Sequence, residues 1–279
     1  MSFSNIAYAK LDLSFDREQF IQEFDNRIMA QSTPMGTGMF SVKATKELNS
    51  VWNMVPDSEY ETADSWEQPG DITTLRHIIR GRPVWQMFQL MALEVQEDDD
   101  PLVLKFAQHG GAPIRNETIG RDFKLKPGFE DLEIVKWINN VLPLDKVSFI
   151  HCVSMQPNCF STIHRDGKGL FTKGSSAGVN RLYNAGYVII NINITDGGVP
   201  LYWSLDHDVK TPLKANSDVY LTNDYFLHGV PICTSVRRQI RVTGIPKLEL
   251  WDSFDKSSVI DLGKDYQFSS IENQYRFNL

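Results

Sequence analysis

The hydrophobic positions near the N-terminus follow a helical period. Asp16, followed three residues later by Gln19, is typical of a helix start. Phe20, Phe24 and Ile28 then recur at a spacing that puts them on one face. The sequence therefore predicts an early amphipathic helix with an apolar face turned towards the core.

A second helix is predicted for residues 131–142, because Pro143 follows it and four apolar residues share one face: Leu132, Val135, Ile138 and Leu142. We expect this helix to pack against a sheet. Between about residues 30 and 81 the periodicity is weak and Pro and Gly are scattered, which predicts loops and short strands.

After Leu144 the pattern changes to short β-rich runs separated by turn residues: VSFIHCVSM, CFSTIHRD, YVIININI, PLYWSL, DVYLTN, FLHGVPI and QIRVTGI. Strands without helices between them favour an antiparallel sandwich or barrel over a parallel sheet. We expect a single domain over residues 1–279, with a helical N-terminal part (about 1–145), a β core (about 146–250) and a C-terminal extension (about 251–279).

Composition and charge bear on the size of the core, on the class of partner and on the cellular compartment. The hydrophobic share of 42% can supply a sizeable core, and the net charge of −7 without a Lys/Arg-rich run argues against nucleic acid as a partner. No signal peptide or membrane span is apparent. The three cysteines show no C-x-x-C spacing, so we expect reduced thiols in a cytoplasmic protein.

The candidate chemistry lies in the β-rich part. On an extended strand His164 and Asp166 point to the same face, so both can bind one ion. A third ligand can come from His228 in the segment FLHGV. Two imidazoles and one carboxylate on one side of iron(II) leave coordination positions open on the other side. These three residues are therefore the predicted metal ligands.

An arginine follows the distal histidine. Arg238 lies ten residues beyond His228 on a predicted strand. An interior arginine is costly unless it meets an anion, and its planar fork matches a carboxylate. Arg237 and Arg241 compete for this role, but strand alternation puts Arg238 on the face opposite to both of them.

This combination resembles the 2-oxoglutarate/iron(II) dioxygenase superfamily, whose signature is His-x-Asp, a distal His and an Arg about ten positions later. The resemblance covers about residues 149–246. It implies a double-stranded β-helix, or jelly roll, mainly β with flanking helices. It also implies that His164, Asp166 and His228 hold iron(II), and that Arg238 grips the distal carboxylate of the co-substrate 2-oxoglutarate.

The implied activity is the hydroxylation of a C–H bond by a 2-oxoglutarate-dependent dioxygenase, with molecular oxygen and a small molecule as the other reactants. Because Asp166 is present, hydroxylation is favoured over halogenation, while desaturation and ring closure use the same ligands. A free amino acid is the leading substrate. The alternatives are a protein-bound or carrier-bound substrate, and a non-catalytic cupin-like binding module.

Further candidates surround these residues. Arg181, Asn191 and Asn193 are tentative substrate-binding groups, although a polar outer face also explains the asparagines. Residues 168–178 form either a lid or a plain mobile loop. Two other acidic stretches, 94–101 and 206–208, are interpreted as turns rather than metal sites.

Overall fold

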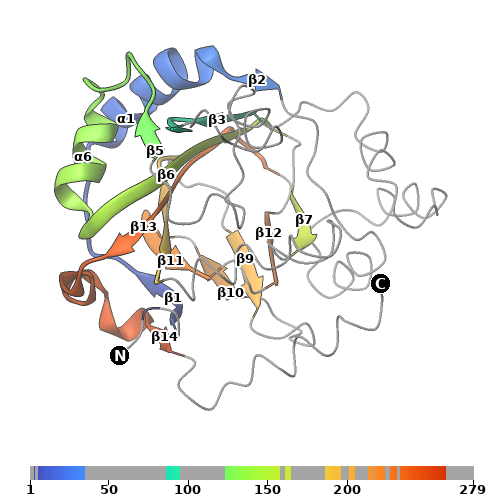
Figure 1. Cartoon of the computed structure of the whole chain (residues 1–279). Helices are drawn as coiled ribbons and strands as arrows, with labels where there is room; N and C mark the ends of the chain where they lie inside the picture. The colour runs from blue at the N-terminus through green and yellow to red at the C-terminus, as the bar shows by residue number, and fades with distance from the viewer. Residues whose placement is uncertain are drawn as a thin grey trace, which may run out of the picture.

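The protein contains a large and a small antiparallel sheet, with helices on the outer side of the large one (Figure 1). The computed structural model describes residues 3, 6–34, 86–94, 123–157, 161–164, 186–195, 201–204, 213–215, 217–223, 227–230 and 233–261. The four-stranded sheet lies on the side of the large sheet away from α1 (Arg17–Glu23) and α6 (Glu133–Val141) (Figure 1).

The large sheet has eight strands in the order β14-β1-β11-β8-β13-β6-β3-β2. In chain order their bounds are β1 Ile6–Lys10, β2 Thr33–Pro34, β3 Gln86–Gln89, β6 Leu144–Met155, β8 Val188–Asn193, β11 Val219–Thr222, β13 Arg237–Pro246 and β14 Ile260–Asp261. The smaller sheet has the order β10-β9-β12-β7. It contains β7 Ser161–His164, β9 Leu201–Ser204, β10 Leu213–Ala215 and β12 Leu227–Val230.

The eight strands from β6 to β13 form a jelly roll. Four of them, in the order β6-β13-β8-β11, make the centre of the large sheet, and the other four make the small sheet in the order β7-β12-β9-β10. The chain crosses from one sheet to the other at β6–β7, β7–β8, β8–β9, β10–β11, β11–β12 and β12–β13. This is the double-stranded β-helix that the sequence predicts.

The N-terminal part contributes strands as well as helices. β1 pairs with β11 and with β14, so it extends the large sheet beyond the jelly roll on one side, and β3 and β2 extend it on the other. Two further strands, β4 (Met91–Leu93) and β5 (Phe123–Leu125), form a separate pair. The sequence predicts no strand at β1.

Both predicted helices are present. The backbone N–H of Gln19 donates to the Asp16 carboxylate at 3.0 Å, which is the capping contact that the sequence predicts. α1 continues into the π-helix η2 (Phe24–Ile28) and a short 3-10 turn, η3 (Met29–Gln31). The predicted apolar face of this helix is buried, as is the predicted face of α6. Two more 3-10 helices lie in the C-terminal part, η4 (Leu248–Ser253) and η5 (Lys256–Ser258).

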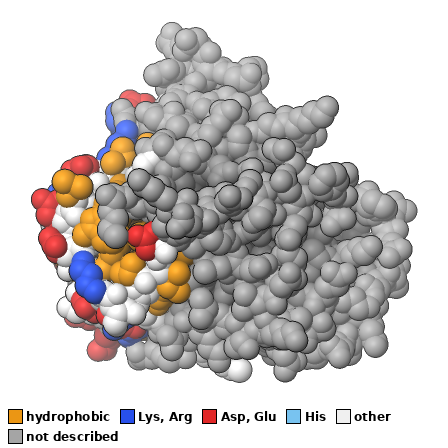
Figure 2. All heavy atoms as spheres, turned by 90° about the horizontal axis from the view of Figure 1, so that it is seen from below, with side chains coloured by type: hydrophobic (Ala, Val, Ile, Leu, Met, Phe, Trp, Pro, Cys, Tyr) orange, Lys and Arg blue, Asp and Glu red, His pale blue; other side chains and the backbone are white. Residues whose placement is uncertain are grey.

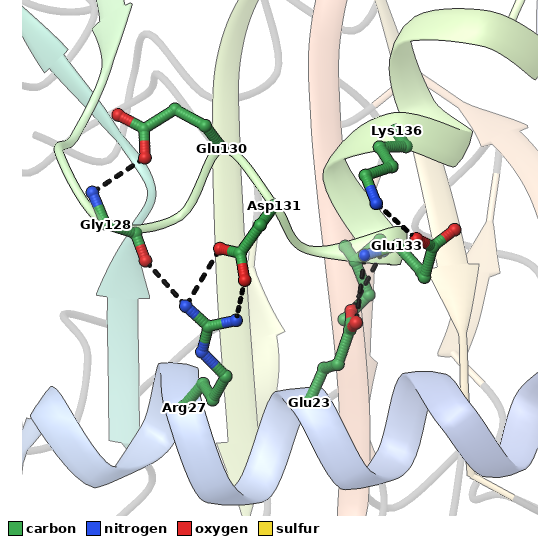
Figure 3. A network of polar contacts seen from close by, with 8 residues as sticks. Glu23, Arg27, Gly128, Glu130, Asp131, Glu133 and Lys136 are labelled. Carbon is green, nitrogen blue, oxygen red and sulfur yellow. Dashed lines mark hydrogen bonds and ion pairs between the residues drawn. The ribbon is translucent and has the colours of Figure 1, made fainter.

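The N-terminus of α6 is capped by the other helix (Figure 3). Leu132 at its N-cap position offers no side-chain acceptor. Instead the two carboxylate oxygens of Glu23 accept hydrogen bonds from the backbone N–H groups of Glu133, at 2.9 Å, and of Ile134, at 3.0 Å. A carboxylate at a helix N-terminus satisfies unpaired donors and opposes the helix dipole.

One turn further on, Arg27 holds the loop that precedes α6 (Figure 3). Its guanidinium donates to both carboxylate oxygens of Asp131, at 2.6 and 2.9 Å, and to the carbonyl of Gly128 at 2.8 Å. Gly128 has φ +89°, a conformation that favours glycine, and its N–H donates to Glu130. The two helical segments are thus joined by charge-assisted contacts above their apolar faces.

The middle of the large sheet is apolar on the face towards the helices. Ile240 lies opposite Cys152 and Ile192, and Val242 lies opposite Ile150 and Ile190. All of these side chains are buried in one core with the aromatic residues of α1 and η2. Because Cys152 is buried, the pKa of its thiol is raised well above the ordinary value.

The described surface seen from below shows hydrophobic side chains grouped between acidic and basic ones (Figure 2). Leu248 in η4 is the most exposed of the large hydrophobic side chains described, at 80%. Within the described part of the chain, no helix has the length and apolar character needed to cross a bilayer.

The capping contact of Glu23 can be tested by mutation. Glu23→Ala leaves two N–H groups of α6 without their acceptor, so we expect the free energy of unfolding to fall by about 1–2 kcal/mol in urea denaturation. Glu23→Gln, which keeps one acceptor oxygen, should lose less. The exposed Glu249→Ala is the matched control, and an equal loss in that variant would contradict the capping role.

Candidate functional site

The face of the large sheet opposite to the helices is polar and largely buried. On β13 it carries Arg237, Gln239 and Arg241, which alternate with residues on the helix-facing side. Arg237 is 2% exposed, and Asn191 on the neighbouring strand β8 is also 2% exposed. Burying such groups is costly unless they are hydrogen-bonded or serve a ligand. We call this surface the inner face.

A hydrogen-bonded network occupies the middle of the inner face. The side-chain amide nitrogen of Gln239 donates to Asn191 Oδ1 at 2.6 Å and contacts the Tyr220 hydroxyl at 3.3 Å. Asn191 Nδ2 donates to the hydroxyl of Thr222 at 2.9 Å. Three strands, β13, β8 and β11, are therefore linked through their side chains as well as their backbones.

Next to this network, Tyr220 and Arg237 lie against each other, and both are buried. Burial raises the pKa of the Tyr220 hydroxyl, which the charges of Arg237 and Arg241 oppose in part. The hydroxyl therefore stays protonated at neutral pH and can donate a hydrogen bond. Arg237 approaches the sulfur of Met155 at 3.9 Å. The inner face thus holds a neutral phenol beside a buried cation.

Arg238 points away from the inner face. Its Nε and Nη2 atoms each donate to a carboxylate oxygen of Asp25 in η2 at 2.7 Å. The backbone N–H of Arg238 donates to the Thr195 hydroxyl at 2.5 Å. Arg238 thus binds a carboxylate of the protein itself on the helix-facing side. Its predicted role as the co-substrate anchor would require it to leave Asp25, whereas Arg237 and Arg241 already lie on the inner face.

A second arginine attaches the same helix to the sheet. Arg17 at the start of α1 donates to the backbone carbonyl of Asn193 at 3.1 Å and forms an ion pair with Asp218 at 2.6 Å. Together Arg17 and the Asp25–Arg238 pair hold α1 and η2 against the ends of β8 and β13. These contacts join the helix layer to two of the strands that form the inner face.

The two predicted histidine ligands come from adjacent strands of the small sheet. β12 pairs with β7 in antiparallel register, and His228 lies directly opposite His164. Directly opposed positions of an antiparallel pair lie on the same face of the sheet. The fold therefore brings together two histidines that are far apart in the sequence.

The other predicted site residues are partly outside the described residues. Asp166, Arg181, the segment 168–178 and the stretch 206–208 lie there. Asn191 and Asn193 lie on the inner face and are buried, rather than on a polar outer face. The amide of Asn191 is used by Thr222 and Gln239, and the amide oxygen of Asn193 accepts from the N–H of Thr195 at 3.3 Å. Their predicted contact with substrate stays a prediction.

Sequence reasoning missed several residues of the inner face, among them Gln89, Tyr220 and Gln239. Gln239 could have been found, because alternation puts it on the same side of β13 as Arg237 and Arg241. Gln89 could not have been found in this way, because the four residues of β3 show no alternation of apolar and polar side chains that would identify the inward side. Among the described side chains, no group of three or more His, Cys, Asp or Glu residues is arranged to hold a metal ion.

Comparison with known proteins gives structural likenesses at low identity. No family model and no curated protein matches the sequence. An oxidoreductase of the 2OG-Fe(II) oxygenase family from Burkholderia pseudomallei is 9% identical, with a TM-score of 0.35, over 83% of this chain and 91% of that chain. A prolyl-4-hydroxylase from Pseudomonas putida is 10% identical, with a TM-score of 0.28, over 83% and 100%.

A prolyl hydroxylase from Trichoplax adhaerens, solved with a hypoxia inducible factor peptide fragment, is 9% identical, with a TM-score of 0.28, over 85% of this chain and 92% of that chain. The fold assignment rests on the strand topology described above.

The contact between Asp25 and Arg238 should stabilise the fold. In a double-mutant cycle of Asp25→Ala and Arg238→Ala, we expect a coupling energy of about 0.5–1.5 kcal/mol in urea unfolding, because the pair is bidentate but partly exposed. Since the Asp25 side chain is 38% exposed, added salt should reduce the coupling. Additive effects of the two substitutions would show that the pair contributes nothing.

Proposed function

We propose that this chain is an iron(II)- and 2-oxoglutarate-dependent oxygenase whose metal ligands are His164, Asp166 and His228. The observation that carries the proposal is the register of β7 and β12, which sets His164 directly opposite His228. Asp166 follows His164 by two residues, the spacing of the His-x-Asp motif. With His164 and His228 on the small sheet and the buried Arg237 on the inner face of the large sheet, one jelly roll could hold a metal and an anion.

The residues fit the chemistry of the group. Two imidazoles and one carboxylate suit iron(II) and leave positions for a chelating co-substrate and oxygen. When bound, the metal supplies the activation of oxygen that is coupled to decarboxylation of 2-oxoglutarate. In the overall reaction a substrate C–H becomes C–OH, one oxygen atom enters the substrate, the other enters succinate, and carbon dioxide leaves.

The co-substrate carboxylate is assigned to Arg237 rather than to Arg238. Arg237 is buried on the inner face, where a guanidinium in low dielectric gains most from a bidentate carboxylate. The hydroxyl of Tyr220, which contacts Arg237 and stays protonated, can donate to the same carboxylate. The other carboxylate and the keto group of 2-oxoglutarate remain for the metal.

The rest of the network orients these groups. Gln239 donates to Asn191 and contacts the hydroxyl of Tyr220, which itself lies against Arg237. A free amino acid is the proposed substrate, with hydroxylation of a C–H bond as the reaction. The chain's own contribution is to hold the reactants in place and to exclude water from them.

The metal assignment predicts binding of one iron(II) per chain. In anaerobic titration, His164→Ala and His228→Ala should each weaken iron binding by at least about tenfold, because each removes one of three protein ligands. His77→Ala, a histidine outside the motif, is the control. If the double variant of His164 and His228 retains full iron affinity, the site has been assigned wrongly.

The assignment of the co-substrate carboxylate to Arg237 can be tested by comparing substitutions of Arg237 and of its neighbour Arg238. Arg237→Ala should weaken 2-oxoglutarate binding by about 2–5 kcal/mol, read from the visible band of the anaerobic iron complex. Arg238→Ala should leave this affinity within about threefold, since its partner is Asp25. Circular dichroism checks that both variants are folded, and Arg237→Lys retains the charge but loses the bidentate contact. The opposite order of effects would return the anchor to Arg238.

A further inference from the structure

Gln89, at the end of β3, is a buried amide whose polar atoms are unused. The residue is 4% exposed, and neither its Nε2 nor its Oε1 atom has a hydrogen-bond partner among the described residues. Its neighbour Phe88 packs on Phe129 on the helix side, so Gln89 faces the inner side. Because buried amides in folded proteins are nearly always hydrogen-bonded, this one indicates a ligand or a water that binds there.

Solvent reaches the inner face beside Gln89. Met87 lies opposite Val153 and Gln89 lies opposite His151, so these four side chains share the inner side of β3 and β6. Met87, His151 and Val153 are each partly exposed. The middle of the inner face differs, because Asn191 there is only 2% exposed. A small molecule can therefore approach Gln89 from the side of β3.

The charged residues in the same row have contacts of their own. His151 lies between Gln89 and Arg241, and both His151 and Arg241 are engaged with other groups. The ring of Phe149 packs edge-on against His151 at 4.3 Å between centroids. The unused hydrogen-bonding capacity of this row is therefore that of the neutral amide of Gln89. Since an amide offers no charge to balance an ion, it is best matched by a neutral polar group.

A primary carboxamide is a neutral group that satisfies both polar atoms of Gln89. The side chain of Gln89 presents a donor, Nε2–H, beside an acceptor, Oε1. A second primary carboxamide offers the same pair in the reverse order, so two N–H···O bonds can form together. A carboxylate only accepts and an ammonium group only donates, so each leaves one atom of Gln89 unsatisfied. A trans peptide group points its N–H and C=O in opposite directions and reaches only one of the two atoms.

We propose that Gln89 binds a primary carboxamide of the substrate through a pair of hydrogen bonds. This inference rests on the proposed oxygenase function and narrows its substrate class, because asparagine and glutamine are the free amino acids that carry this group. Gln89 then determines specificity for the substrate, while Arg237 on the same face is the residue proposed for the co-substrate.

The test measures binding by calorimetry in the full-length, iron-loaded protein with 2-oxoglutarate and without oxygen, so that no turnover occurs. The probes are L-asparagine and L-glutamine, each compared with its acid, L-aspartate or L-glutamate, which has the same shape but lacks the amide donor. We expect one of the two amides to bind at least about tenfold more tightly than its acid. Gln89→Leu should weaken binding of that amide at least about tenfold, because two hydrogen bonds are lost.

Three comparisons separate this role from a structural one. Gln89→Leu replaces an unsatisfied amide with an apolar group of similar size, so it should be at least as stable as the wild type in urea. Gln89→Met, which keeps the unbranched shape, should lose affinity for the amide to the same extent. Gln86→Leu, on the helix-facing side of the same strand, is the matched control and should bind the amide like the wild type. In all three variants the affinity for 2-oxoglutarate should stay within about threefold.

Two results would overturn the subsite. One is equal affinity of the wild type for each amide and its acid, and the other is wild-type affinity for the amide in Gln89→Leu and Gln89→Met, which would show that Gln89 holds only a water. In either case a visible band with iron and 2-oxoglutarate would leave the oxygenase function standing. If the wild type gives no such band, the oxygenase function itself fails, and the subsite fails with it.

Discussion

The alternation of side chains along β13 is the constraint on which both the apolar core beneath the helices and the polar inner face depend. This strand lies between β6 and β8 and pairs with both over most of its length. Its residues Ile240 and Val242 enter the core beneath the helices, while Arg237, Gln239 and Arg241 face inward. A shift of one residue would exchange the two sets and put three polar side chains into the apolar layer.

This arrangement explains how a buried polar surface can be tolerated. Hydrogen bonds join the side chains of Gln239, Asn191, Tyr220 and Thr222, and these bonds offset part of the cost of burying polar groups in the middle of the inner face. The two arginines and the unpartnered Gln89 lie to either side of this middle.

Much of the fold could be predicted from sequence, but the inward side of β13 could not. The helices followed from Asp16 and from the spacing of Phe20, Phe24 and Ile28, and seven strands followed from β-rich runs. β1 was missed because its alanines carry little pattern and its partner β11 lies about two hundred residues away. The rule of an arginine ten residues after the distal histidine selects Arg238. Only the pairing of β13 with β6 and the contact with Asp25 show that Arg238 faces the helices and not the inner face.

The helical segment formed by α1 and η2 contacts both the second helix and the large sheet, because side chains on its different sides reach different neighbours. Glu23 and Arg27, one turn apart, hold α6 and its preceding loop, while Asp25, half a turn away, holds Arg238. Arg238 and Arg237 are neighbours on β13 and point to opposite faces of the sheet. The helix layer therefore contacts, through Asp25 and Arg238, the same strand that carries the buried Arg237 on its inner side.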